Sequence, residues 1–329
     1  MPPTGPRSIL QVHPSRRCNL RCRHCYSNSG PDVDDTMELS HLLQLIDDSA
    51  GLGYDVLSVS GGEPLMYPSL PELLERARCN GLRTTVTSNG TLLSARRLER
   101  IAGLVDVLAI SLDGSPESHA AMRQSGRAFS TMKSRLDAVR AAGVPFGFVF
   151  TLTMFNVHEL AYVAQFAAEQ GAGLVQVHPL EAEGAAAANL AHAVPDSREC
   201  AFAVVEAARL EAEHGLRIQV DITHQTEIER CPEAFLAFAD EPRTSLGTWL
   251  SPLVVETDGT VSPLAYGFAR DFQLGTLGPA RLPELADQWD PTPFLDLCRR
   301  TACRLASGER ALVNWYDEIT RAGRELVRA

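Results

Sequence analysis

The sequence predicts an α/β protein built on a parallel sheet, and three observations support this. Short β-rich apolar runs alternate with helical stretches from Ile9 to about Val220. Polar loops follow the apolar runs, and many helical stretches end at glycine, which suits a left-handed C-terminal cap. Repeated βα units of this length form a parallel sheet with right-handed crossovers. Periodicity alone leaves both a barrel and a doubly wound sheet open.

The expected elements follow from these patterns in chain order. We expect strands at Ile9–Val12, Val56–Val59, Thr84–Val86, Val107–Ile110, Phe146–Phe150, Leu174–Val177 and Ile218–Val220. We expect helices between them at Leu39–Leu52, Leu70–Asn80, Ala95–Ala102, Phe129–Ala142, Val157–Gln170 and Glu199–His214.

The loops that follow the strands hold nearly all of the unusual polar groups. In parallel α/β barrels the active site gathers at the carboxyl ends of the strands, so these loops would meet at one mouth. Their content therefore favours a barrel. The loops carry the cysteines after the first strand, Ser60–Pro64, Thr87–Thr91, Ser111–Gly114, Thr153 with Asn156, and His178-Pro179.

Composition sets limits on the class of protein. The length of 329 residues allows about two domains, and 45% hydrophobic with 22% charged residues is ordinary soluble composition. Met1–Pro6 has no apolar core of a signal peptide, and no membrane span is expected. Eight cysteines without such a signal predict a reducing cytoplasm. The net charge of −11 argues against nucleic-acid binding.

The segment Cys18 to Cys25 carries three cysteines at C-x3-C-x2-C spacing, the middle one being Cys22. Three thiolates on a four-iron cluster leave one iron open for chemistry. A zinc site that adds His24 is an alternative, but adjacent His24 and Cys25 chelate one tetrahedral ion poorly. A disulfide framework would require a small secreted domain.

This loop resembles the cluster loop of the radical S-adenosylmethionine (radical SAM) superfamily, with His24 before the third cysteine where an aromatic residue or His is usual. The resemblance implies a [4Fe–4S] cluster held by Cys18, Cys22 and Cys25, with the free iron chelating SAM. It also implies a partial (β/α)6 TIM-like barrel. The implied reaction is reductive cleavage of SAM to a 5′-deoxyadenosyl radical, which abstracts hydrogen from a substrate.

The stretch Gly61-Gly62-Glu63-Pro64 resembles the GGEP motif of the same superfamily, which binds the amino group of SAM. Glycines let the backbone approach a ligand closely. A carboxylate such as that of Glu63 adds a charge-assisted acceptor for an ammonium group. The alternative is an ordinary turn before a helix.

Further cofactor-binding positions come from the resemblance. Ser88, Asn89 and Ser111 match ribose- and carboxylate-binding positions, although turns explain the same residues. Arg123 matches an arginine that meets the SAM carboxylate, with a solvated helix arginine as the alternative. His178 follows the sixth strand and is either an adenine or substrate contact or a structural histidine.

The C-terminal part has a different pattern. A hairpin over Leu253–Glu256 and Thr260–Ser262, with a turn at Asp258-Gly259, precedes a helix at Leu282–Trp289. This order resembles the SPASM/twitch extension of some radical SAM enzymes. We therefore expect a barrel over residues 1–230 and a smaller α+β extension over residues 231–329.

The extension lacks most of the cysteines that hold auxiliary clusters in that family. Ser251-Pro252 and Ser262-Pro263 stand where hairpin cysteines are expected. Cys231, Cys298 and Cys303 are interpreted as structural thiols, with an auxiliary cluster as the alternative. Cys231 is also our hypothetical catalytic hydrogen donor, because a thiol can quench a substrate radical.

The resemblance predicts the substrate class only loosely. SPASM-like relatives often modify ribosomally made peptides by crosslinking, oxidation or epimerisation, so a precursor peptide is the first expectation. Radical chemistry on a small molecule, such as a sugar or cofactor precursor, is the second, and a non-catalytic zinc-binding protein is the third. An acidic electron donor such as flavodoxin, or a ferredoxin, could be steered by the basic rim of the cysteine loop. That rim contains Arg16, Arg17, Arg21 and Arg23.

Overall fold

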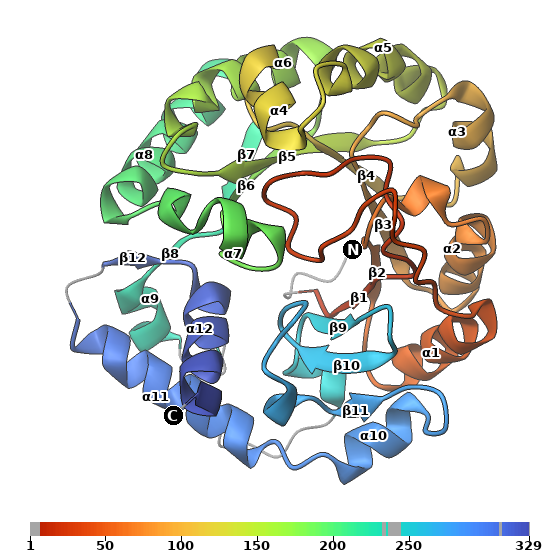
Figure 1. The fold of residues 1–329 in the computed structure, drawn as a ribbon, viewed down its shortest axis with the longest axis vertical. Coiled ribbons are helices and arrows are strands. Elements are labelled where there is room, and N and C mark those ends of the chain that lie inside the picture. Colours follow the sequence, from red (N-terminus) through yellow and green to blue (C-terminus); the bar gives the residue numbers. More distant parts are fainter. Residues whose placement is uncertain (1–6, 232–234, 236–244, 309–310, 329) are drawn as a thin grey trace.

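The predicted α/β class is confirmed by a computed structural model, which describes residues 7–231, 235, 245–308 and 311–328. A curved sheet forms the centre, and helices cover its convex side (Figure 1). Among the described residues no helix combines the length and the apolar character needed to span a bilayer.

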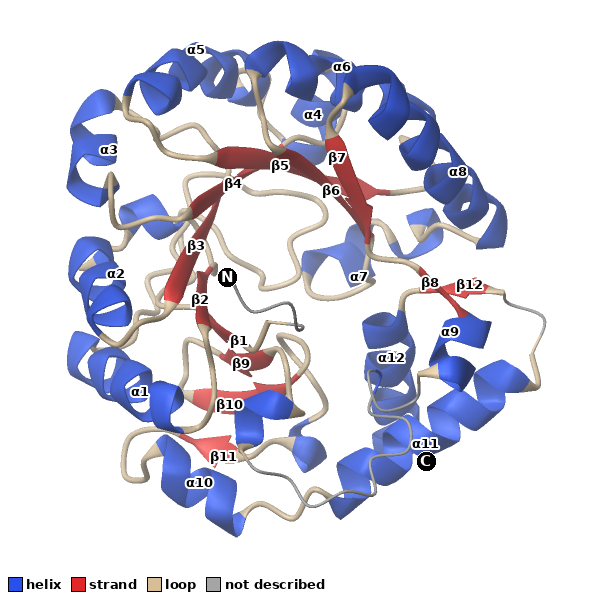
Figure 2. Ribbon diagram, turned by 180° about the vertical axis from the view of Figure 1, so that it is seen from behind, coloured by secondary structure: helices blue, strands red, loops and turns tan. Residues whose placement is uncertain are grey.

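Seven parallel strands make up the larger part of the sheet, in the order in which they occur in the chain. The seventh strand extends the six-stranded barrel that the sequence predicted, but the sheet does not close on itself (Figure 2). The strands are β1 (Ile9–Val12), β2 (Val56–Val59), β3 (Arg83–Ser88), β4 (Val107–Ser111), β5 (Phe146–Leu152), β6 (Leu174–Pro179) and β7 (Arg217–Val220).

Most of the helices that connect these strands lie outside the curve of the sheet (Figures 1 and 2). Predicted helix ends at Gly171 and Gly215 are confirmed, since both glycines are left-handed caps with φ of 75° and 61°. The helices are α1 (Leu39–Gly51), α2 (Leu70–Cys79), α3 (Ala95–Ile101), α4 (Pro116–Arg123), α5 (Ala128–Ala141), α6 (Leu160–Gln170), α7 (Ala185–Asn189) and α8 (Ser197–His214).

The two faces of the sheet differ in chemistry, because side chains alternate along each strand. The face toward the helices is buried and apolar, with residues such as Leu10, Val59 and Phe150 fully buried. Closed barrels fill their interior with bulky branched side chains. Here the inner face instead carries mostly small or polar side chains that stay partly exposed. These are Gln11, Ser58, Thr85, Thr87, Ala109, Val149, Thr151, Gln176 and His178.

The C-terminal hairpin continues the same sheet. Strand β9 (Leu253–Val255) pairs in parallel with β1, so that Leu10 lies beside Leu253. Strands β10 (Thr260–Pro263) and β11 (Gly275–Thr276) add antiparallel pairs at that edge. The proposed division at residue 230 stays a prediction, although one sheet and one hydrophobic core run across it.

The remaining C-terminal elements lie across from the curve of the sheet, where α9, α11 and α12 stand together (Figure 1). A short second sheet joins β8 to β12. The C-terminal elements are β8 (Thr223–His224), α9 (Gln225–Arg230), β9 (Leu253–Val255), β10 (Thr260–Pro263), β11 (Gly275–Thr276), α10 (Leu282–Gln288), α11 (Thr292–Ala306), β12 (Leu312–Val313) and α12 (Trp315–Arg328).

Some element boundaries differ from the expected ones. Helix α8 begins two residues early, because Asp196 and Glu199 form a capping box around its first turn. The expected helix from Val157 starts with a 3-10 turn, η2 (Val157–Glu159), before α6. Helices α4, α9, α11 and α12 were not expected from the sequence.

Candidate functional site

The three cysteines lie in the long loop between β1 and α1, which crosses the concave side of the sheet as the dark red segment of Figure 1. All three are free thiols; Cys18 is buried, and Cys22 and Cys25 are partly exposed. The Cys18 N–H donates to the Gly30 carbonyl at 3.1 Å, and the Cys25 N–H donates to the Cys22 carbonyl at 3.3 Å. These bonds fold the short segment that carries the three thiols.

Each of the three sulfurs lies near an N–H donor. The Ser29 backbone N–H is 3.3 Å from Cys25 Sγ, Arg123 Nη1 is 3.7 Å from Cys22 Sγ, and Asn89 Nδ2 is 3.9 Å from Cys18 Sγ. Hydrogen bonds to sulfur are one of the means by which proteins tune iron–sulfur clusters. The donor set therefore fits three thiolate ligands of a cluster.

Burial raises the pKa of Cys18 to about 12 and raises that of Cys22. A coordinating metal deprotonates such thiols outright, so binding of the cluster would convert Cys18 and Cys22 to thiolates. Within the described part of the chain, no three His, Cys, Asp or Glu side chains are grouped as around a single metal ion. His24, the fourth ligand of the zinc alternative, lies near Asp113, Arg123 and His119.

The GGEP stretch packs directly on the cysteine loop. The Gly62 N–H donates to the Ser15 carbonyl at 2.8 Å, and the Glu63 N–H donates to the Arg17 carbonyl at 3.0 Å. A Cβ atom on Gly62 would lie 2.2 Å from the Arg17 carbonyl oxygen. Gly61 has φ of +112°, so both glycines are required for this close approach.

The carboxylate of Glu63 faces the neighbouring loop. It accepts hydrogen bonds from Ser88 Oγ at 2.8 Å, from the Asn89 N–H at 2.9 Å and from the Leu65 N–H at 3.2 Å. Burial raises the pKa of Glu63, and these donors oppose the rise. These hydrogen bonds join the loop after β2 to the loop after β3. The expected role of Glu63 as an acceptor for an ammonium group stays a prediction. Pro64 begins the 3-10 turn η1 (Pro64–Met66) that Glu63 caps.

Ser88 and Asn89 have comparable roles. The Ser88 hydroxyl also accepts from the Gly90 N–H at 3.1 Å, and Asn89 Nδ2 donates to Asn19 Oδ1 at 2.9 Å. Asn89 therefore contacts the cysteine loop, whereas Ser88 contacts Glu63 and Gly90. Their role as ribose contacts stays a prediction, as does that of Ser111, which is 8% exposed at the end of β4.

Arg123 forms a buried ion pair. Its Nε donates to Asp113 Oδ2 at 2.6 Å, and Asp113 is fully buried. Burial acts to raise the pKa of Asp113, but the charge of Arg123, aided by His24 and His119, lowers it to about 2. Arg123 thus links α4 to the loop after β4 through Asp113, and to the cysteine loop through Cys22. Its expected contact with the SAM carboxylate stays a prediction.

The histidine of this network, His119, was not singled out from the sequence. Its Nδ1 accepts from the Asp113 N–H at 3.2 Å, and burial lowers its pKa to about 4. The sequence indicated a turn at Asp113-Gly114. It gave no sign that His119, six positions after Asp113 and on a helix, would be a hydrogen-bond partner of that turn.

His178 lies at the end of β6 between two carboxylates. Its Nδ1 is 3.0 Å from Asp221 Oδ2, and its Nε2 is 3.3 Å from Glu181 Oε1. Burial acts to lower the pKa of His178, but hydrogen bonds to Asp221 and Glu181 raise it to about 10. Both ring nitrogens are therefore engaged, and its expected contact with adenine or substrate stays a prediction.

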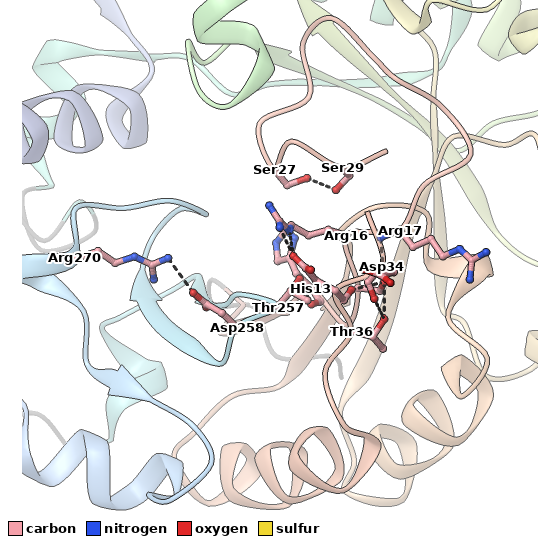
Figure 3. Close-up of polar contacts among 12 residues, drawn as sticks. His13, Arg16, Arg17, Ser27, Ser29, Asp34, Thr36, Thr257, Asp258 and Arg270 are labelled. Atoms are coloured by element: carbon pink, nitrogen blue, oxygen red, sulfur yellow. Dashed lines mark hydrogen bonds and ion pairs between the residues drawn. The ribbon is translucent and has the colours of Figure 1, made fainter. Parts of the chain in front are cut away.

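The hairpin side of the mouth is held by polar contacts that Figure 3 shows. Thr257 Oγ1 donates to the His13 carbonyl at 2.9 Å, and Arg270 pairs with Asp258 at 3.3 Å. The His13 ring lies 4.7 Å from the ring of Tyr266, which the loop after β10 supplies. The C-terminal region thus lines one side of the cysteine loop.

Three further cysteines lie in the C-terminal region. Cys231 is exposed at the end of α9, which packs on α11. Cys298 is buried and Cys303 is exposed on α11. In the hairpin, Ser262 Oγ donates to Glu256 at 3.1 Å, so this serine has a structural contact where a cluster cysteine was expected. The role of Cys231 as hydrogen donor stays a prediction without support from this geometry.

Comparison with known proteins bears on the predicted resemblance. Residues 12–167 match the model of the radical SAM superfamily. The resemblance to this superfamily is therefore confirmed. Radical SAM proteins use a [4Fe–4S] cluster and SAM, which fits the three thiols and the glycine-rich loop packed against them.

Relatives with different substrates resemble this radical SAM chain. It is 31% identical over 221 residues to Fe-coproporphyrin III synthase of Methanosarcina barkeri, covering 65% of this chain and 55% of that protein. It is 29% identical over 255 residues to PqqA peptide cyclase of Ruegeria pomeroyi, covering 76% of this chain and 65% of that protein. The chain spans about half the length of most of these curated relatives.

Solved structures share the fold over nearly the whole chain. The structure of anSMEcpe with bound AdoMet matches with a TM-score of 0.67 at 18% identity, covering 98% of this chain and 99% of that one. SuiB of Streptococcus suis bound to precursor peptide SuiA matches with a TM-score of 0.62 at 15% identity, covering 78% and 58%. The resemblance therefore includes the C-terminal extension.

Proposed function

We propose that this chain is a radical SAM enzyme that modifies a ribosomally made peptide, by crosslinking, oxidation or epimerisation. One observation carries the proposal: three free thiols, each beside an N–H donor, lie at the mouth of an open parallel sheet against the glycine-rich loop. When bound, the cluster would deliver one electron to SAM, and the resulting 5′-deoxyadenosyl radical would take hydrogen from the substrate.

The chain's own residues would hold the cofactors. Cys18, Cys22 and Cys25 would bind the cluster, and the backbone of Gly61 and Gly62 would approach SAM. The residues Glu63, Pro64, Ser88, Asn89 and Arg123 would fix these loops, and Ser111 and His178 would line the same mouth. The partly exposed inner face of the sheet would orient the substrate, while the C-terminal extension limits access of water.

The peptide assignment rests on similarity and on charge. The match to a peptide cyclase covers more of this chain than the match to the porphyrin enzyme. On the mouth side, Glu181 and Asp221 flank the cation of His178, and Asp317 of α12 lies near Glu181 and Arg321. Carboxylates outnumber cations among these five groups, so a neutral or basic peptide segment would be favoured there over a substrate with several carboxylates.

Synthesis of a porphyrin or heme is the second candidate, because relatives that are 31% and 34% identical to this chain are named Fe-coproporphyrin III synthase and AdoMet-dependent heme synthase. It belongs to the small-molecule alternative that the sequence left open.

The expected electron donor, a flavodoxin or ferredoxin, and a cytoplasmic location belong to the same proposal. The basic rim is less available than the sequence suggested, since Arg16 pairs with Asp35 and Arg21 pairs with Asp32. Arg17 is exposed and Arg23 is partly exposed.

The test is anaerobic incubation of reduced protein with SAM and either a candidate precursor peptide or Fe-coproporphyrin III. We expect about four irons per chain, 5′-deoxyadenosine, and a mass change or deuterium uptake in the peptide alone. A triple Cys18→Ala, Cys22→Ala, Cys25→Ala variant is the control. Product from the porphyrin alone would favour the second candidate. Stoichiometric zinc without iron would overturn both.

A further inference from the structure

The loop between β6 and α7 rests on the third cysteine of the radical SAM motif. The Ala185 N–H donates to the Cys25 carbonyl at 2.8 Å. Gly184 has φ of +52°, and a Cβ there would lie 2.2 Å from the Tyr26 carbonyl oxygen and 2.6 Å from that of Cys25. The contact is therefore between backbones and leaves no space for a side chain.

The same loop is attached to the C-terminal helix. Arg324 of α12 forms an ion pair with Glu183, and these side chains are only 27% and 16% exposed. The Glu183 carbonyl accepts from the Ala186 N–H at 2.9 Å, so the ion pair holds the residue that precedes the N-cap of α7. Helix α12 is thereby connected to Cys25 through three consecutive residues of one loop.

The other end of the loop is also fixed. Glu181 pairs with His178 of β6, and His178 pairs with Asp221 after β7. Asp317 of α12 lies close enough to Glu181 for their charges to interact. With its start bound to the sheet and its middle bound to α12, the loop has little freedom to move away from the cysteine loop.

We infer that Arg324 and Gly184 are positioning residues, through which the C-terminal helix holds the main chain of the third cluster cysteine. Arg324 fixes Glu183, and Gly184 permits the contact that aligns the Ala185 N–H with the Cys25 carbonyl. The inference rests on the proposed function in one respect, namely that Cys25 is a cluster ligand.

Metal-free protein provides the first test. Under anaerobic reducing conditions we would measure the rate at which iodoacetamide alkylates Cys25, by mass spectrometry of the Cys25 peptide. In Arg324→Ala we expect the rate to rise about tenfold, because local opening of the loop exposes the thiol. Arg324→Lys keeps the charge and should stay within about twofold of the natural protein.

The matched control is Arg304→Ala, which removes ion pairs of α11 with Glu318 and Glu325 of α12 but does not touch the loop. Its alkylation rate at Cys25 should equal that of the natural protein. Equal rates in Arg324→Ala and Arg304→Ala would overturn the inference.

Reconstituted protein provides a second readout. Gly184→Ala should shift the EPR spectrum of the reduced cluster or lower its iron content at least twofold. Gly103→Ala, also at positive φ (76°) but with open space around it, should change neither. An unchanged spectrum and iron content in Gly184→Ala would contradict the inference. If the natural protein takes up no iron, the proposed function fails, while the alkylation comparison still decides whether α12 holds Cys25.

Discussion

The carboxyl ends of β1 to β4 and those of β5 to β7 form two unlike halves of one mouth. In the first half, charged side chains are buried: Glu63 is 2% exposed and bonded to Ser88 and Asn89, and Asp113 is fully buried beside Arg123. In the second half, His178 is 36% exposed and its two carboxylate partners are about one-fifth exposed.

This difference separates two tasks. In the first half, Glu63 and Arg123 are hydrogen-bonded to neighbouring loops, whereas Asp113 Oδ1 and His119 Nε2 are buried without a hydrogen-bond partner. The bonds of Glu63 and Arg123 fix these loops before a ligand arrives, as a site for one defined cofactor requires. The second half offers charged, partly hydrated groups beside α12, where substrates of different chemistry could be distinguished. Relatives named for porphyrins and for peptides fit this division, because a common cofactor half can serve different substrate halves.

The buried ion pair should give the largest effect. Arg123→Met leaves Asp113 charged and buried without its partner, which costs about 3–5 kcal/mol of unfolding free energy. Chemical denaturation of metal-free protein measures this. Arg140→Met removes an exposed pair with Asp137 and should cost only about 0–1 kcal/mol. Equal losses in both variants would show that the first half is no more tightly organised than the surface.

Local sequence patterns predicted the fold well because they reflect local physics. The bounds of β1 and β2 agree with the expected ranges, and the glycine caps lie where expected. The parallel pairing of β9 with β1 could not be predicted, because it joins residues far apart in the chain and leaves no periodic signal. Helix α12 was missed although it is amphipathic, since its partners are a loop and a helix of unrelated sequence.

The sequence located candidate site residues but not their protein partners. Glu63 and Arg123 both contact the cysteine loop, and their binding of SAM stays a prediction. Their side chains could equally have pointed to a ligand or into the protein, and the choice depends on Ser88, Asn89 and Asp113, which reach them from other strands. Tertiary hydrogen bonds of this kind have no counterpart in the local sequence.

The contact between the glycine-rich loop and the cysteine loop gives the next largest effect. Gly62→Ala forces a Cβ to within 2.2 Å of a backbone oxygen, so one of the loops must shift. We expect a loss of about 1–3 kcal/mol in unfolding free energy. Gly51→Ala, at the end of α1 with open space, should instead be neutral or stabilising by up to about 1 kcal/mol. A neutral Gly62→Ala would mean that the cofactor half is not tightly packed.

The second half should respond to pH in a characteristic direction. The pKa of His178 is raised to about 10 in the folded chain, above about 6.5 when unfolded. Its stabilising contribution is complete below pH 6.5 and is lost as the pH rises through 10. Because a third of the side chain faces solvent, we expect a loss of only about 1–2 kcal/mol across this range.

His178→Gln should remove this alkaline loss, whereas exposed His41→Gln should retain it. Denaturation curves of metal-free protein at a series of pH values provide the measurement. If the loss of unfolding free energy at alkaline pH persists in His178→Gln, other groups cause it. The second half would then lack the distinctive charge of His178.

The smallest effect is expected outside both halves. Cys298 and Cys303 stand five residues apart on α11, so their side chains point about 140° apart around the helix. One is fully buried and the other is exposed, which prevents both from facing one auxiliary cluster. Cys303→Ala should therefore keep about four irons per chain, whereas Cys18→Ala should lose them. A loss of several irons in Cys303→Ala would place a second cluster in the extension and make that region part of the redox machinery.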